Sequence, residues 1–158
     1  MRRTVKYLKA WKDNQNIEST QVELSGIIIT ILVAEEFSGI DNRDDQTLLS
    51  TITNIKNRLE NNFSCIKPVV PHEDLLSDYS KTSKDNLLRK INILRDRLDE
   101  AINEEKNQLE SSKILRRYIF GDRFPKGEDK STEEDNGDNS EYLKTKNPTI
   151  LNDDGTSA

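Results

Sequence analysis

Charged and hydroxyl-bearing residues near the start of the chain have the types and the spacing to hold a phosphate chain. Arg2, Lys6 and Lys9 recur at intervals of four and three residues, so they share one side of a helix. Ser25 directly precedes an apolar run over residues 26–34. A lysine ammonium would give a polyphosphate a counter-charge, and a serine hydroxyl would give it an oriented hydrogen bond. The competing interpretation is a solvated helix face, which is the commoner origin of such a basic stripe.

The sequence lacks the groups that nucleophilic catalysis or a zinc site would need. The single histidine, His72, lies in a proline-containing segment, seven residues after Cys65. A cysteine–histidine nucleophile pair needs a preorganised oxyanion site and usually a third, orienting group, and a zinc site needs about four ligands. The sequence also contains neither GxxxxGK[ST] nor GxGxxG, the two glycine-rich patterns that bind phosphates. We therefore interpret His72 as a solvated loop residue and predict no catalytic residue in this chain.

Asp41, Asp44 and Asp45 form a compact candidate for a carboxylate metal site. Two-metal chemistry requires carboxylates of this kind on rigid elements. Acidic residues also complement the dipole of a helix when they lie in its first turn, and these three precede an apolar pattern of helical period. We favour the helix start over the metal site and predict no metal ligands here.

The periodicity of the apolar residues predicts an all-α fold, a bundle of four to six helices. Helices are expected over residues 2–13 and 22–37, and a third from about residues 41–45 to residues 61–63. A fourth, long helix is expected from about residues 82–85, continuing as far as Tyr118. No strand pattern or internal repeat is apparent.

Smaller signals add detail to these helices. Thr20 and Glu23 have the spacing of a capping box that would open the second helix. This helix is apolar on every face over residues 26–34, which is typical of the buried centre of a bundle. Pro68 and Pro71 indicate an extended connector after the third helix. The first helix carries its apolar side away from its basic residues, at Thr4, Tyr7, Leu8 and Trp11.

Composition divides the 158 residues into a folded part, 1–125, and a disordered acidic tail, 126–158. Residues 1–120 hold 19 basic and 19 acidic residues, whereas residues 121–158 hold 5 and 10, so the net charge of −5 lies in the tail. The tail has too few apolar residues to offset the entropy of ordering. A net acidic chain argues against direct nucleic-acid binding. The single cysteine excludes an internal disulfide, and the longest apolar run falls well short of the roughly 20 residues that span a membrane. We therefore expect a cytoplasmic protein.

Five segments then carry a family resemblance. Over residues 1–125 the chain contains, in this order, RRTVKYLKAWKD, STQVELSGIIITILVAEEF, NRDDQTLL, KPVVPHEDLL and IFGDRFP. Together they resemble the C-terminal helical half of bacterial cyclic-oligonucleotide synthases. These are the CD-NTases, nucleotidyltransferases related to cyclic GMP-AMP synthase and, more distantly, to oligoadenylate synthase.

The resemblance implies a function and a set of site residues. Members of the family use Mg²⁺ to polymerise nucleoside triphosphates such as ATP and GTP into cyclic di- or trinucleotide messengers of antiphage defence. Their helical half closes the nucleotide cleft over an α/β catalytic core. Carried onto this sequence, Lys9 and Ser25 would contact the donor triphosphate. Arg43 and Asp44 would read a base or brace the lobe, and Arg123 would be a structural brace.

The catalytic half of that family has no counterpart in these residues. The sequence begins with Met1 directly before the first helix, and it lacks the Gly-Ser element and the paired acids. We therefore expect that this polypeptide alone binds no Mg²⁺ and makes no cyclic nucleotide. It would be one piece of a split gene, a truncated relic, or a fragment that complements a separately encoded core.

Loss of the core would also leave an apolar patch of Tyr7, Leu8, Trp11 and the flanks of residues 27–33 exposed, favouring self-association. A second hypothesis comes from a different class of function. In it, the chain is a non-catalytic helical module that binds a partner protein.

Overall fold

Five α-helices form the part of the chain that the computed structural model describes, residues 1–17 and 24–129, and no strand occurs in those residues. This confirms the all-α prediction. The α-helices are α1 (Arg2–Ile17), α2 (Gly26–Glu36), α3 (Asp44–Asn61), α4 (Lys81–Asp99) and α5 (Gln108–Leu115). Two π-helical turns, η1 (Glu100–Glu104) and η2 (Arg116–Phe120), extend α4 and α5, and a short 3₁₀ turn, η3 (Gly121–Arg123), follows.

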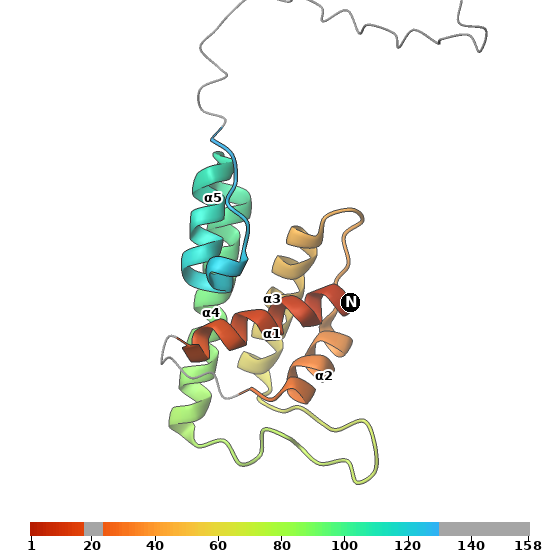
Figure 1. Ribbon diagram of the computed structural model, residues 1–158. Helices are drawn as coiled ribbons and strands as arrows, with labels where there is room; N and C mark the ends of the chain where they lie inside the picture. The colour runs from red at the N-terminus through yellow and green to blue at the C-terminus, as the bar shows by residue number, and fades with distance from the viewer. Residues whose placement is uncertain (18–23, 130–158) are drawn as a thin grey trace, which may run out of the picture.

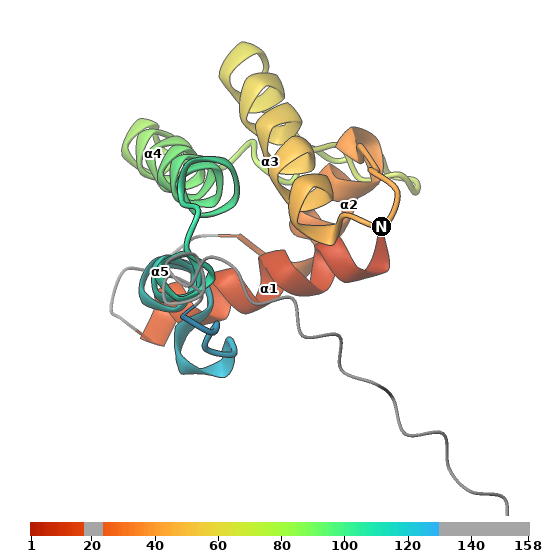
Figure 2. The same ribbon diagram turned by 90° about the horizontal axis from the view of Figure 1, so that it is seen from above.

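α1 bridges two groups of elements, α2 with α3 and the η2 turn that follows α5. α3 packs against α2 on one side and α4 on the other, and α5 folds back along the end of α4 (Figure 1). Seen from above, α1 runs along α2 and α3, and its C-terminal half reaches η2, the turn that follows α5 (Figure 2). It contacts α2, α3 and η2. No helix in the described residues is long and apolar enough to cross a membrane.

α2 is shorter than the sequence predicts. It begins at Gly26 because the Ser25 hydroxyl accepts a hydrogen bond from the backbone N–H of Ile28, which caps the helix at that point. The predicted capping box of Thr20 and Glu23 lies outside the described residues. Nor is α2 buried on every side, since Ile27 remains 50% exposed. The helix therefore faces the core with one side only, through Ile28, Ile29, Ile31, Leu32 and Val33.

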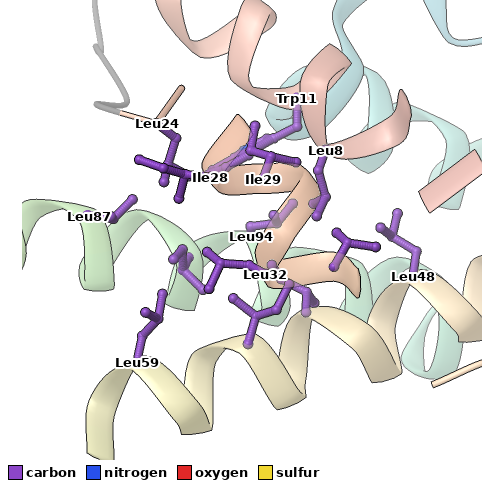
Figure 3. Close-up of a cluster of buried hydrophobic side chains, with 14 of the residues drawn as sticks. Leu8, Trp11, Leu24, Ile28, Ile29, Leu32, Leu48, Leu59, Leu87 and Leu94 are labelled. Carbon is purple, nitrogen blue, oxygen red and sulfur yellow. The ribbon is translucent and has the colours of Figure 1, made fainter. Parts of the chain in front are cut away.

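The core is built from the inner faces of the first four helices. Figure 3 shows Leu8 and Trp11 of α1 meeting Ile28 and Ile29 of α2. Leu8 is 4% exposed and Trp11 3%. The expected apolar patch is therefore wrong for these two residues, because α2 covers the side of α1 that we expected to be free. Tyr7 is half-buried at the edge of the core.

The predicted fourth helix is two helices folded into a hairpin. Its helical path stops at Glu104, and the Asn107 side chain accepts hydrogen bonds from the backbone N–H groups of Leu109 and Glu110. The Glu105 carboxylate in turn accepts the N–H of Asn107. These local bonds offer the backbone an alternative to a continuous helix. The apolar period continues across the turn and therefore does not reveal it.

Residues 62–80 form the connector that the two prolines predict. Leu75 donates its N–H to the Cys65 carbonyl at 2.8 Å, and Asp74 accepts the N–H groups of Cys65 and Leu76. Cys65 and Leu76 are buried and anchor the segment to the core. His72 is exposed, and its Nδ1 lies 3.1 Å from the Lys67 carbonyl oxygen. It lies in a solvated loop, as predicted, while Cys65 is enclosed.

We predict a loss of stability at alkaline pH through Cys65. Burial, followed by the Glu35 carboxylate, raises the pKa of this thiol to about 11. In the unfolded chain a cysteine ionises near 8.5, so above that pH the unfolded state releases a proton that the folded state keeps. Stability from this group is therefore complete below the unfolded pKa and declines up to about pH 11. We expect a loss of about 2–3 kcal/mol in urea unfolding between these limits.

The matched variant for this prediction is Cys65→Ala. It should be less stable than the parent chain at pH 7 because it leaves a cavity. Its stability should nevertheless fall less between pH 8 and 11. Parallel pH profiles for the two proteins would contradict the assignment to Cys65.

The folded part extends beyond Pro125, where we expected the disordered tail to begin. The backbone N–H of Gly127 donates to the Ser112 hydroxyl at 2.8 Å, and Asn107 Nδ2 donates to Asp129 at 3.0 Å. Residues 126–129 therefore lie along α5. Residues 130–158, the rest of the predicted tail, lie outside the described residues.

Candidate functional site

Lys9 lies over the first turn of α2, next to Ser25. A methyl group placed on Gly26 would lie 3.4 Å from Lys9 Cε and 3.6 Å from its Nζ. The ammonium group therefore reaches the backbone at the start of α2, directly after Ser25. Lys9 and Ser25 are both exposed, so their polar groups are open to a ligand. The sequence alone does not predict that Lys9 contacts Gly26.

The start of α2 offers several donors at this point. The Ser25 oxygen accepts the Ile28 N–H at 3.3 Å, which leaves the hydroxyl proton free for an outside acceptor. The N–H groups of Gly26 and Ile27 have no acceptor within the helix because they belong to its first turn. The helix dipole adds a partial positive charge. With the Lys9 ammonium, these groups make a setting that favours an anion such as a phosphate.

Arg43 and Asp44 lie in a different cluster, at the start of α3. Asp44 accepts a hydrogen bond from Arg3 Nη1 at 2.8 Å and another from the Tyr7 hydroxyl at 3.3 Å. Arg43 binds Asp45 with two parallel hydrogen bonds, of 2.9 and 2.8 Å. Asp44 thus ties α1 to α3, which agrees with the bracing alternative for this residue. Asp44 and Asp45 also lie in the first turn of α3, as predicted.

The electrostatics of this second cluster follow from these pairs. The hydrogen bonds from Arg43 lower the pKa of Asp45. Burial raises the pKa of Tyr7, and the nearby Asp44 carboxylate adds to the rise. At neutral pH Asp45 is therefore charged and Tyr7 protonated. The cluster is suited to hold two helices together, and its carboxylates are already engaged.

The four predicted nucleotide-binding residues thus separate into two groups. Lys9 and Tyr7 are two positions apart on α1, so their side chains leave the helix on nearly opposite sides. Lys9 points to the start of α2, whereas Tyr7 points to Asp44 at the start of α3. The structure brings Lys9 and Ser25 together and holds Arg43 and Asp44 elsewhere. No protein-family model matches the chain.

Within residues 1–17 and 24–129, no group of three or more histidine, cysteine, aspartate or glutamate side chains could hold a metal ion.

The brace of the last turn is Arg116 and not Arg123. Arg116 donates to the carbonyls of Asp122 and Phe124 and pairs with the Asp122 carboxylate. Arg123, in the η3 turn, is exposed.

Proposed function

We propose that this chain is the helical lobe of a cyclic-oligonucleotide synthase, where it holds the donor triphosphate. Such an enzyme makes cyclic di- or trinucleotide messengers from nucleoside triphosphates in antiphage defence. The observation that supports the proposal is the position of the Lys9 ammonium beside Gly26 in the first turn of α2, directly after the capping residue Ser25. The resemblance to the CD-NTases assigns these same two residues to the triphosphate.

In this proposal the two helices act together on one phosphate group. The backbone N–H groups of Gly26 and Ile27 and the Ser25 hydroxyl donate to the phosphate oxygens, and Lys9 supplies the full counter-charge. The Mg²⁺ of the reaction would have to be held elsewhere, since the described residues contain no fitting ligand group and Asp44 and Asp45 are engaged by arginines. The contribution of the lobe is thus to position the triphosphate.

Titration of the full chain with ATP and GTP tests the proposal. We expect Lys9→Ala to weaken the affinity about tenfold, because it removes one charge-assisted hydrogen bond. Lys106→Ala, which removes the same charge from an exposed position after α4, should change it less than about threefold. The Gly26 amide signal in nuclear magnetic resonance spectra reports binding at the site itself.

Ser25 allows a second, sharper comparison. Asparagine and aspartate both cap helices well, so Ser25→Asn and Ser25→Asp should fold alike. Only Ser25→Asp places a negative charge beside Lys9, and it should abolish binding that Ser25→Asn retains. Equal affinities for the two variants, or an unchanged affinity in Lys9→Ala, would remove the support for the proposal.

The connector favours a second candidate, a non-catalytic helical module that binds a partner protein. Ile66, Val69 and Val70 are exposed, and Val70 is 82% exposed. Adjacent exposed apolar residues favour contact with another protein. In this case Val69→Ser with Val70→Ser would weaken partner binding, and Lys9→Ala would not. The nucleotide titrations above separate the two candidates.

A further inference from the structure

An open cleft of about 1020 Å³ lies between α1, α5 and the segment that follows η2. Ala10 and Asn14 contribute the α1 side. Asn14 is five positions beyond Lys9, which turns it about 140° around the helix. The cleft is therefore separate from the Lys9–Ser25 site. Its remaining lining residues are Leu109, Lys113, Arg116, Arg117, Phe120, Gly121, Asp122, Arg123 and Lys126.

The lining of the cleft is strongly basic. It contains five lysine or arginine residues and a single acidic one, in a chain whose net charge is −5. Two of the cations are neutralised, Arg116 by Asp122 and Lys113 by Glu110. Arg117, Arg123 and Lys126 have no carboxylate partner in the part of the chain that the structure describes. These three cations lie on η2, on η3 and beyond it, and the Arg117 guanidinium also lies 5.2 Å from the centroid of the Tyr118 ring.

The wall that carries Lys126 is fixed to α5. The N–H of Gly127 donates to Ser112, whose hydroxyl is buried and donates in turn to the Leu109 carbonyl. A methyl group on Gly127 would lie 2.2 Å from the Gln108 carbonyl oxygen, so only glycine allows this approach. The segment after η3 is therefore held as the rim of the cleft, which Lys126 lines together with Arg117 and Arg123.

The floor of the cleft contains an amide that lacks a partner. Asn14 Nδ2 is buried and has no hydrogen-bond acceptor among the described residues. Gly121, whose φ is 68°, leaves room for this side chain, since a Cβ at that position would lie 2.4 Å from Asn14 Oδ1. A buried donor without an acceptor is unfavourable. Because this nitrogen is closed to solvent, an oxygen atom of a ligand in the cleft would satisfy it only once the Asn14 amide turns toward the cleft.

We propose that this cleft binds a small anion carrying two or more phosphate groups. Arg117, Arg123 and Lys126 would neutralise its charge, and the Asn14 amide, once turned toward the cleft, would donate to one of its oxygens. The volume is that of a small-ligand site. A single-stranded nucleic acid would instead need an extended groove with aromatic rings for its bases. The inference stands on the cleft residues alone and does not require the proposed function.

Titration of the full chain with inorganic tripolyphosphate tests the cleft. We expect the triple variant Arg117→Gln, Arg123→Gln and Lys126→Gln to lose at least about tenfold in affinity. The matched control is Lys81→Gln, Arg89→Gln and Lys106→Gln, which removes the same charge from exposed positions outside the cleft. It should change the affinity less than about threefold. Asn14→Asp, which has the same shape and an added negative charge, should weaken binding as well.

The possible results differ clearly. Loss in the cleft variants with retention in the control and in Lys9→Ala supports the cleft. Equal loss in the control would mean that only net charge matters, and loss confined to Lys9→Ala would place the phosphate at α2. Either result would overturn the inference, as would absence of binding or tighter binding of single-stranded RNA that tripolyphosphate does not displace. Failure of the cleft leaves the ATP and GTP titrations at Lys9 unaffected.

Discussion

Replacing Trp11 with alanine is expected to lower the free energy of unfolding by about 3–5 kcal/mol. Trp11 is 3% exposed, and it lies where α1 meets Ile28 and Ile29 of α2 (Figure 3). Truncation would remove most of the ring's buried apolar surface and leave a void that the neighbouring helices cannot fill completely. Unfolding by guanidinium chloride, followed by circular dichroism, measures the loss without needing tryptophan fluorescence.

Two substitutions serve as controls for Trp11. Trp11→Phe keeps an aromatic ring and should be considerably milder than alanine. Asp13→Ala, at an exposed position of the same helix, should stay within about 0.5 kcal/mol of the parent. A loss below about 1 kcal/mol for Trp11→Ala would show that α1 is not packed on α2 as described. The position of Lys9 over α2 would then lose its structural basis.

Replacing Leu98 with alanine is expected to lower the free energy of unfolding by about 2–5 kcal/mol. Leu98 is 1% exposed near the end of α4. It also borders a small recess of about 220 Å³ whose other lining residues include Tyr7, Asp44 and Phe120. Truncation would enlarge this existing space, so little of the lost contact could be regained by collapse. Chemical denaturation measures the change.

The same helix provides the controls for Leu98. Ile93 is 45% exposed on α4, so Ile93→Ala removes a similar side chain from a position where little surface is buried. Its effect should stay below about 1 kcal/mol. Leu98→Met keeps most of the volume and should cost less than about 1.5 kcal/mol. Similar losses in Leu98→Ala and Ile93→Ala would contradict the described orientation of α4.

The all-α class could be predicted because apolar residues recur at helical spacing along the chain. That pattern records which side of a helix faces the core, and it placed Thr4, Leu8 and Trp11 correctly on the inner side of α1. It does not record where a helix stops if the apolar spacing continues through the turn. For this reason the break before Asn107 was missed, although asparagine is a common N-cap and could have suggested it.

The candidate site was only partly accessible to sequence reasoning. Charge spacing and the resemblance both selected Lys9 and Ser25, which the fold places together. The same reasoning grouped them with Arg43 and Asp44, because residue types do not say which face of α1 each helix start meets. The partner of Asp44 is Arg3, on another side of that helix. The basic cleft was not predicted at all. Its cations come together only because the segment that follows η3 runs back along α5.

The enclosed position of Cys65 has a practical consequence. It is the only cysteine in the sequence, and its side chain is fully buried with a thiol pKa raised to about 11. The thiolate is the reactive form, so maleimide reagents at neutral pH should spare it. A cysteine introduced at an exposed position such as Lys126→Cys can therefore carry a fluorophore at one defined place while the native residue stays unchanged.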